Sequence, residues 1–316
     1  MNQEERKKQY GLLCKQKKIN GLFLQPWWLD ATGSWDVSFA YRNEQLVGAL
    51  PFATGYRGFI SYVGMPSFTH HLKIWMEKPP DISAHKWLTR EKQIIWSLID
   101  NLPRHGFFSM VFTEDSFDNW LPFYWKGFRQ EMRYTFVIDR NGSTTPDTNM
   151  NRNIKRNIRE ASEEITIQKN IESQLFFDQC RNTYERQKMK MPYSYESFSK
   201  LDQAITSHHA GIKLGAYSKD QKLLAVSYLL WDQDTAYYLL AGDDDVGRST
   251  GASILLCREA LRIAFEEKEV TTFDFCGSML EPITEIRRQF GARSVPLLKI
   301  FKANYKWLDI FYKLTR

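Results

Sequence analysis

The sequence predicts an α+β protein of two domains, each with a mixed, mainly antiparallel sheet flanked by helices. The chain has 316 residues, which corresponds to about two domains of ordinary size. A polar stretch without apolar periodicity, residues 139–148, lies near the midpoint and contains both Gly142 and Pro146, as a linker would. On each side of it, helices precede alternating apolar strands, and a strand–helix–strand pattern follows. We therefore expect an N-terminal domain over 1–145 and a C-terminal domain over 146–316.

The first half shows the elements of one such domain. Alternating apolar residues on both sides of Asn43 and Glu44 predict a hairpin with a tight polar turn. Apolar side chains from Trp87 to Leu102 recur near helical spacing and predict a helix. In chain order, the predicted elements are helices over 4–18 and 27–32, strands over 35–42, 45–54 and 58–64, a helix within 81–104, a strand over 107–113, a helix over 119–125 and a strand over 128–138.

The second half opens on an amphipathic helix over 150–164, in which Ile154, Ile158 and Ala161 share one apolar stripe. Near the C-terminus, Gly291 is expected to end a helix, since glycine is the usual residue after a last helical turn. The other predicted elements are helices over 171–187 and 195–208, strands over 211–218, 223–231 and 235–241, a helix over 250–268, a strand over 271–275, a helix over 281–290, a strand over 295–301 and a last helix with Trp307, Ile310 and Phe311.

The composition narrows the classes of protein and partner. Lys and Arg number 43 and Asp and Glu 37, which leaves a formal charge of +6 and favours anionic partners such as phosphates, nucleic acid or a membrane surface. No stretch approaches the roughly 20 apolar residues that span a bilayer, and the charged N-terminus lacks the pattern of a signal peptide. The four cysteines are far apart and fit no zinc spacing. We expect reduced thiols in a cytoplasmic protein, without a transmembrane segment or a bound metal.

Residues 248–253 lie between a predicted strand and a long predicted helix. The first N–H groups of a helix and its dipole attract anions, and Gly251 lets a phosphate approach the backbone closely. Thr250 or Ser249 is expected to cap the helix, and Arg248 to add a charge-assisted bond to a phosphate oxygen. The alternative is an ordinary capped helix. The candidate phosphate-binding residues are Arg248, Ser249, Thr250, Gly251, Ala252 and Ser253.

Two further patterns contain residues that suit chemistry. Asp274 lies between two Phe residues at the end of a predicted strand, and a carboxylate among apolar rings needs a partner, for which nearby arginines are the candidates. Arg152, Arg156 and Arg159 lie at i, i+4 and i+7 on one helix face. They either cradle a diphosphate or a nucleic-acid backbone or form a solvated face. Cys276 is a weaker candidate, for a nucleophile, because no His is close in sequence.

At this point several runs resemble those of the FemAB-like acyltransferases, a tandem branch of the GNAT superfamily. Residues 273–278 and 286–292 are similar to the family's "DFgG" and "FKxxFGa" segments. Residues 152–161 resemble its "R..IRkA" helix, while 46–51 and 23–28 resemble its "vGalPl" and tryptophan-containing segments. The resemblance covers most of the chain and is most specific toward the C-terminus.

The resemblance implies two GNAT-like domains and acyl transfer from a thioester or an aminoacyl-tRNA to an amine. GNAT domains hold the pyrophosphate of the donor at a loop whose Arg and first Gly correspond to Arg248 and Gly251. Ser253 departs from that pattern, which has Gly or Ala at its last position. Ile286 and Cys276 likewise replace the Phe and the Gly of the family.

For catalysis, the resemblance points to Arg287, which stands in place of the family's Lys and would stabilise the carbonyl oxygen as it becomes an oxyanion. The acceptor amine must lose a proton to water or to a carboxylate, for which Asp274 is the candidate. Tyr238, or its neighbour Tyr237, lies on the strand before the donor loop and is the candidate to protonate the leaving group.

Three functions remain open. The first is an N-acyltransferase that uses acetyl-CoA or another acyl-CoA as co-substrate and acts on an amino sugar or another small amine of the cell envelope. The second is a peptidoglycan-bridge aminoacyltransferase that takes its acyl group from aminoacyl-tRNA. The basic helix favours it, and the absence of a sustained heptad disfavours it. The third is a non-catalytic GNAT-like scaffold. We expect a small-molecule or cell-wall-precursor acceptor, with the basic face of Arg152, Arg156 and Arg159 as its binding residues, and no DNA partner.

Overall fold

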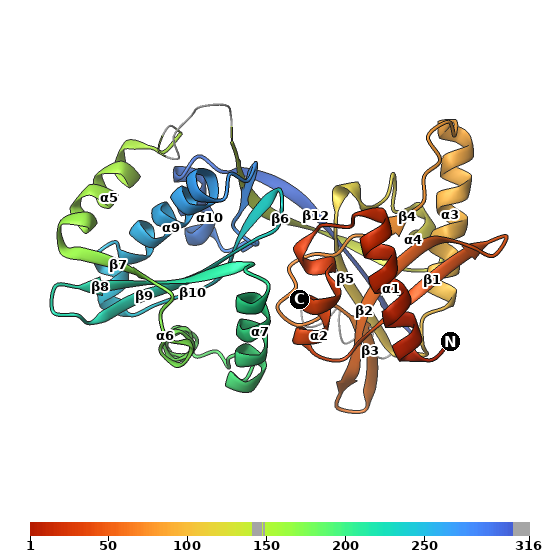
Figure 1. The fold of residues 1–316 in the computed structure, drawn as a ribbon, viewed down its shortest axis with the longest axis horizontal. Coiled ribbons are helices and arrows are strands. Elements are labelled where there is room, and N and C mark those ends of the chain that lie inside the picture. The colour runs from red at the N-terminus through yellow and green to blue at the C-terminus, as the bar shows by residue number, and fades with distance from the viewer. Residues whose placement is uncertain (141–146, 148, 306–316) are drawn as a thin grey trace. The chain divides into compact units, whose positions relative to one another are not determined.

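The computed structural model describes residues 1–140, 147 and 149–305, which form two compact units (Figure 1). Unit 1 comprises Met1–Arg133 and the chain from Pro296 onward, and unit 2 comprises Tyr134–Val295. The chain passes from one unit to the other inside two strands, β6 (Arg129–Asp139) and β12 (Arg293–Ala303). Within each unit, helices cover mainly antiparallel strands around a separate apolar core. The α+β fold class is confirmed.

In unit 1 the strands are neighbours in the order β1-β2-β3-β5-β12, and β4 pairs with β2. The β3–β5 pair is parallel, and the other pairs are antiparallel. Alternation along β5 buries Phe108, Met110 and Phe112 completely. The elements are α1 (Gln3–Lys17), η1 (Leu22–Leu24), α2 (Pro26–Thr32), β1 (Trp35–Arg42), β2 (Gln45–Arg57), β3 (Ile60–Gly64), β4 (Trp75–Met76), α3 (Ala84–Asp100), β5 (Phe107–Thr113), η2 (Glu114–Ser116) and α4 (Leu121–Trp125).

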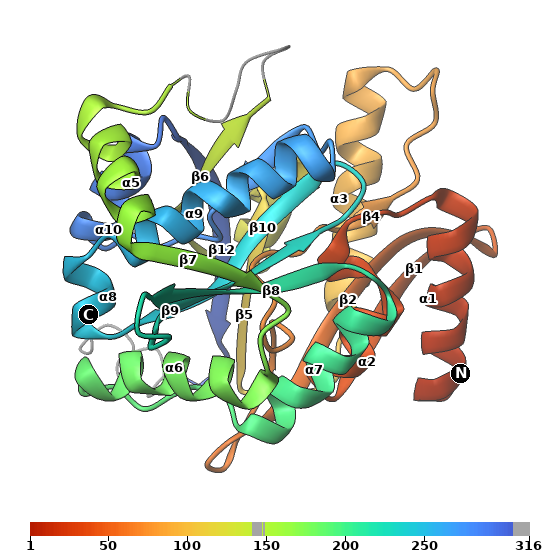
Figure 2. The same cartoon turned by 60° about the vertical axis from the view of Figure 1, so that its left-hand side comes forward.

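In unit 2 the strand order is β6-β11-β10-β9-β8-β7, antiparallel except for the parallel pair β10–β11. Helix α9 covers one face of these strands, and α6 and α7 cover the other (Figure 1, Figure 2). The elements are α5 (Arg152–Glu164), β7 (Ile165–Lys169), α6 (Ser173–Arg186), α7 (Tyr195–Ser207), β8 (Gly211–Ser218), β9 (Leu223–Trp231), β10 (Thr235–Asp243), α8 (Asp245–Ser249), α9 (Ala252–Arg262), η3 (Ile263–Glu267), β11 (Thr272–Asp274) and α10 (Glu281–Gln289). Among the described residues, no helix combines the length and the apolar character needed to cross a membrane.

Most predicted elements are confirmed. The hairpin between β1 and β2 turns at Asn43 and Glu44, whose φ angles of 47° and 64° belong to the mirror-image turn that suits the twist of paired strands. The helix predicted over 250–268 is confirmed, since α9 and the π-helical η3 follow each other without a gap, whereas the short helix α8 before them was not predicted. Strand β7 was not predicted. The last predicted helix lies outside the described residues.

The two units differ from the expected domains at their edges. Strand β12 pairs with β5 from Leu297 to Ala303 and so belongs to unit 1, although the sequence assigned it to the second domain. The expected linker over 139–148 has only 139, 140 and 147 among the described residues, so its role as the domain boundary stays a prediction.

Limited proteolysis within 139–148 is expected to give two fragments that stay together in native buffer. The stretch has little to bury, which favours cleavage. A cut there leaves β12 on the second fragment and its partner β5 on the first. Size-exclusion chromatography with and without denaturant measures this, and separation of the fragments without denaturant would contradict the place of β12 in unit 1.

Candidate active site

The edge of β10 opens where the strand passes the end of β11. Strand β10 pairs with β9 over most of its length, but with β11 only from Thr235 to Tyr237. The register against β9 shifts between Tyr238 and Leu240, which leaves Leu239 without an opposite residue. Such a bulge re-aims side chains and frees backbone polar groups. Among the described residues, the β11 side of β10 is therefore open from Tyr238 onward, and its backbone groups can pair with an extended ligand.

Helix α9 begins beside the far end of this open edge. Gly251 is its N-cap, with φ of 77°, and no side chain caps the helix. Within the described part of the chain, no acceptor bonds the backbone N–H groups of Ala252, Ser253 and Ile254. Bare N–H groups at a helix start make an anion site. The first turn of α9 thus keeps the donors that a phosphate needs.

The expected caps of this helix are wrong. The hydroxyls of Ser249 and Thr250 both donate to the carbonyl of Val246, at 3.0 and 2.8 Å. They turn back into α8, which begins because the Asp244 side chain accepts from the Gly247 N–H at 2.6 Å. A side chain at Gly247 would place its Cβ 2.2 Å from the Leu224 carbonyl oxygen, so only glycine fits there.

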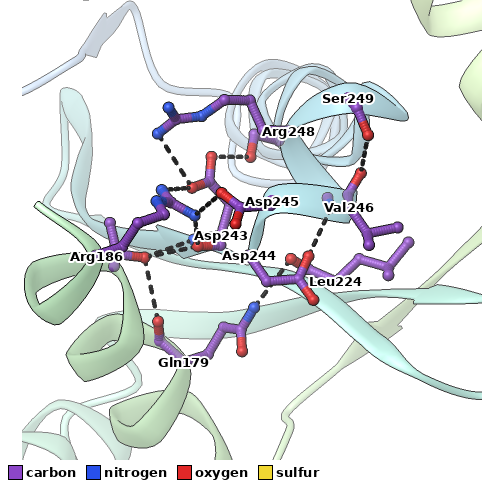
Figure 3. A network of polar contacts seen from close by, with 12 residues as sticks. Gln179, Arg186, Leu224, Asp243, Asp244, Asp245, Val246, Arg248 and Ser249 are labelled. Carbon is purple, nitrogen blue, oxygen red and sulfur yellow. Dashed lines mark hydrogen bonds and ion pairs between the residues drawn. The ribbon is translucent and has the colours of Figure 1, made fainter.

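The acidic residues 243–245, from the end of β10 to the first residue of α8, are paired within the protein (Figure 3). Arg186 of α6 donates to the carboxylate of Asp243 at 2.5 Å and to its carbonyl at 2.8 Å. Ser253 donates to the same carboxylate at 3.0 Å, so its hydroxyl faces Asp243. Asp245 lies 3.5 Å from Arg186. These pairs fix the loop between β10 and α9.

Arg248 contributes positive charge at this loop. Its guanidinium lies 3.6 Å from the Asp243 carboxylate, and 60% of its side chain is exposed. The neighbouring Asp244 forms an ion pair with Lys222 at 3.2 Å. Because Arg186 and Lys222 make the closer pairs with Asp243 and Asp244, Arg248 keeps only the longer pair with Asp243 and stays largely exposed near the start of α9. The combination can bind one or two phosphate groups.

Arg287 of α10 forms the second part of the candidate site. Its guanidinium lies 5.5 and 5.9 Å from the ring centroids of Phe275 and Phe136. Its Nη1 atom is buried and makes no hydrogen bond within the described residues. Burial lowers the pKa of Arg287, but an arginine stays charged at neutral pH. Because a buried polar atom is normally satisfied, this nitrogen is suited to bind an oxygen atom of a ligand.

Tyr238 lies close to Arg287 on the bulged part of β10. Its ring packs 6.1 Å from Phe273 and 6.3 Å from Phe275. Burial raises the pKa of Tyr238, so its hydroxyl stays protonated at neutral pH. The adjacent Tyr237 instead donates to Asp232 at 3.0 Å. Of the two tyrosines that the sequence offered, Tyr238 therefore lies with the arginine.

Asp274 is hydrogen-bonded to Thr135 and to the turn that follows β11, and it makes no ion pair with Arg287 among the described residues. Its Oδ1 accepts from the Thr135 hydroxyl and, at 2.8 Å, from the Cys276 N–H. The Gly277 N–H donates to the Thr135 hydroxyl at 3.0 Å. The expected arginine partner is thus replaced by a threonine hydroxyl 139 residues away, which no local pattern could reveal.

The turn after β11 holds its backbone in an uncommon conformation. Cys276, Gly277 and Ser278 have φ angles of 55°, 86° and 79°, and each non-glycine residue at such an angle costs about 1–3 kcal/mol. The bonds to Asp274 and Thr135 hold this turn against that cost. Burial also raises the pKa of the Cys276 thiol, so it stays protonated at neutral pH and is a poor nucleophile.

The predicted basic face of α5 is exposed but lies away from the loop. Gly251 faces Asn157 and Ala161 of this helix. At 100° per residue, Arg152 and Arg159 lie on the side of α5 opposite these two residues. All three arginines of the face, including Arg156, are exposed, and Arg156 lies 3.8 Å from Glu160. The structure does not bring them to the candidate phosphate-binding loop.

Replacing Gly251 with Val is expected to destabilise the protein by about 1–3 kcal/mol, because a β-branched residue is strained at positive φ. The added Cβ would lie 3.5 Å from the Ala161 Cβ of α5. Gly251→Asn, which tolerates this conformation better, should keep most of the stability. Melting temperatures of both variants measure the difference, and equal values for Val and Gly would contradict the assigned conformation.

Comparison with known proteins finds one domain family that part of the chain matches. Residues 148–281 match the family model described as an acetyltransferase (GNAT) domain. This segment contains the open edge of β10, the candidate phosphate-binding loop and Asp274, whereas Arg287 follows it. No curated protein matches the chain.

Three solved structures resemble nearly the whole chain. FemX has a TM-score of 0.64 and 10% sequence identity, and the match covers 95% of this chain and 96% of FemX. L-PGS from Bacillus licheniformis has a TM-score of 0.59 and 9% identity, with 98% of this chain and 96% of that chain covered. A tandem GNAT protein from the clavulanic acid biosynthesis pathway, solved without AcCoA, has a TM-score of 0.54 and 10% identity, with 95% of each chain covered. At such low identity, these similarities establish the fold, with its two GNAT-like halves.

Proposed function

We propose that the protein is an N-acyltransferase that moves an acyl group from acyl-CoA to an amine. The match of residues 148–281 to the GNAT acetyltransferase domain supports an acyltransferase, and the fold is shared with FemX and with a tandem GNAT protein. The observation that carries this proposal is the buried Nη1 of Arg287, which has no hydrogen-bond partner among the described residues, together with the protonated Tyr238 hydroxyl, with which Arg287 interacts electrostatically. A cation and an acid placed together suit the two charges that acyl transfer creates, on the carbonyl oxygen and on the leaving group.

The donor is proposed to lie along the open edge of β10. Its diphosphate binds the N–H groups of Ala252 and Ser253, with Arg248 adding a charge-assisted bond. The acyl-bearing arm then runs along β10 toward Tyr238, where the backbone at the Leu239 bulge is free to pair with it.

The reaction then proceeds in two steps at the reacting end. The amine nitrogen attacks the thioester carbon, a C–N bond forms, and Arg287 stabilises the oxyanion that develops. The C–S bond breaks as the oxyanion collapses, and the Tyr238 hydroxyl gives its proton to the departing sulfur. The ammonium proton of the acceptor passes to water. Asp274 is proposed to act by positioning, because its carboxylate holds the turn through Thr135 and Cys276.

The proposed acceptor is a small amine of the cell envelope, such as an amino sugar. L-PGS and FemX share the fold at 9–10% identity, and this similarity selects no acceptor.

The donor class is tested by the change in melting temperature with acetyl-CoA, a longer acyl-CoA, and aminoacyl-tRNA. We expect a rise with acyl-CoA. A rise with aminoacyl-tRNA alone would overturn the CoA proposal in favour of an aminoacyl donor, and no rise with any of them would contradict a donor site in this loop.

Arg248→Ala is expected to weaken acetyl-CoA binding about tenfold, the scale of one hydrogen bond to a charged group. Arg181→Ala is a matched control, because Arg181 is a half-exposed arginine of α6 that pairs with Asp178 on its own helix. Isothermal titration calorimetry of both variants gives the comparison. Equal affinity for the two would remove Arg248 from the site.

A further inference from the structure

Two helices of unit 1 carry exposed apolar and aromatic side chains together with a lysine. Leu88, Leu121, Tyr124 and Trp125 are 42–57% exposed. Single exposed apolar residues are ordinary, but these four lie on α3 and on α4, which pack against each other. We call this cluster the aromatic–basic patch, and it consists of Leu88, Lys92 and Trp96 on α3 and Leu121, Tyr124 and Trp125 on α4.

The patch is held in place by its tryptophans. The Trp96 indole N–H donates to the Pro122 carbonyl at 2.9 Å, which joins α3 to α4. The rings of Trp96 and Trp125 meet edge to face at 6.5 Å. Because Leu88, Lys92 and Trp96 are spaced by four residues, they share one face of α3. The exposed side chains therefore form one surface on a fixed support.

A lysine is placed among these rings. The Lys92 ammonium lies 5.1 Å from the ring centroid of Trp96 and 5.8 Å from that of Trp125. It forms no ion pair within the described chain. Lys126 also approaches Trp96, at 5.3 Å, but it bonds the carboxylate of Asp100 at 2.6 Å. The patch thus presents one cation, set between indole rings, that is available to an anion.

We propose that the aromatic–basic patch binds the surface of a membrane that contains anionic lipids. Trp and Tyr rings favour the boundary between headgroups and acyl chains, where one end of the ring is apolar and the other polar. Leu88 and Leu121 add apolar area that can enter the boundary, and Lys92 can meet a lipid phosphate. The formal charge of +6 on the chain adds long-range attraction to the same surface.

A nucleic acid suits the patch less well. Such a partner is bound by many cations, because each neutralised phosphate contributes to affinity. The patch has one available cation and four exposed apolar or aromatic side chains, a ratio that fits insertion into a lipid boundary. This proposal is independent of the donor and the acceptor of the acyl transfer.

Flotation of the full chain with vesicles tests it. We expect binding to vesicles of phosphatidylcholine with phosphatidylglycerol, weaker binding at high salt because the lipid charge is screened, and a shift of tryptophan fluorescence to shorter wavelength. Trp125→Ala and Tyr124→Ala should each reduce partitioning about tenfold, since each removes a large ring from the boundary. Tyr56→Ala is the matched control, because Tyr56 is a 76% exposed tyrosine of β2 outside the patch.

The charge is tested in the same assay. Lys92→Gln should reduce binding to the anionic vesicles, while Lys200→Gln, an exposed lysine of α7, should leave it unchanged. Circular dichroism and melting temperature show that each variant is folded, and Tyr124→Ala remains informative if Trp125→Ala is not. Absence of binding to the anionic vesicles, or equal binding by wild type and the folded patch variants, would overturn the proposal.

Discussion

Arg287→Ala should lower turnover by about 10²–10³-fold while leaving donor affinity nearly unchanged. The factor is that for loss of one group that stabilises an oxyanion, and the charge it stabilises exists only in the transition state. The structure strengthens this expectation, because the buried Nη1 of Arg287 has no hydrogen-bond partner among the described residues. Steady-state kinetics and calorimetric binding of acetyl-CoA, measured on the same preparation, separate the two effects.

Two further variants test whether the loss of turnover in Arg287→Ala comes from the loss of its positive charge at this position. Arg287→Lys should recover much of the turnover, since it keeps a cation where the family pattern has Lys, although without the planar fork of donors. Arg288→Ala is the matched control, because Arg288 is the next residue of α10, is 67% exposed in its side chain and lies 3.4 Å from Glu285. Full turnover by Arg287→Ala would contradict the catalytic role.

The rival role for Arg287, as the ion-pair partner of Asp274, predicts a different result. Breaking a buried ion pair costs about 3–5 kcal/mol, so that role predicts a large fall in melting temperature with normal activity per folded molecule. The structure instead bonds Asp274 to Thr135 and Cys276. We therefore expect Arg287→Ala to change melting temperature much less than turnover.

The strands and most helices could be predicted because their signals are local. Alternation of apolar residues reports which side chains face a core, and the tight turn at Asn43 and Glu44 follows from its neighbours alone. The short helix α8 was missed because it depends on contacts across the fold. Asp244 begins α8 by capping Gly247, and Gly247 is needed because the Leu224 carbonyl lies against it.

In the candidate site, too, only the features with local sequence signals could be predicted. A helix start after a strand is visible in the sequence, so the phosphate-binding loop could be proposed from Gly251 and its neighbours. The partners of Asp274 and Asp243 could not, because Thr135 and Arg186 come from distant segments. The path of β12 into unit 1 was missed for a related reason, since an apolar strand carries no mark of the strand it will pair with.

Tyr238→Phe is expected to reduce kcat by about 10²-fold or more, the lower range for loss of a general acid. The ring packs against Phe273 and Phe275, and Phe keeps that packing, so stability should change little.

The pH dependence of kcat/KM tests whether Tyr238 acts as an acid. Because burial raises the pKa of Tyr238, its hydroxyl stays protonated through the neutral and mildly alkaline range. In the wild type, kcat/KM should rise with pH as the acceptor amine loses its proton and then stay level to about pH 9.5.

The sign of that profile distinguishes an acid from a base. A group that must be protonated, with a pKa raised by burial, produces no fall in rate at mildly alkaline pH, whereas the same tyrosine acting as a base would be inactive there and the rate would climb only near its pKa.

A thiol nucleophile at Cys276 would also give a rise in rate toward high pH, but Cys276→Ala would then abolish turnover, and we expect that variant to retain it. The Phe variant should be slow at every pH and should regain rate with thioesters of acidic thiols, because a sulfur that leaves easily as the anion does not need the proton of Tyr238. Equal slowing of all thioesters in Tyr238→Phe would show that the hydroxyl does not serve the leaving group.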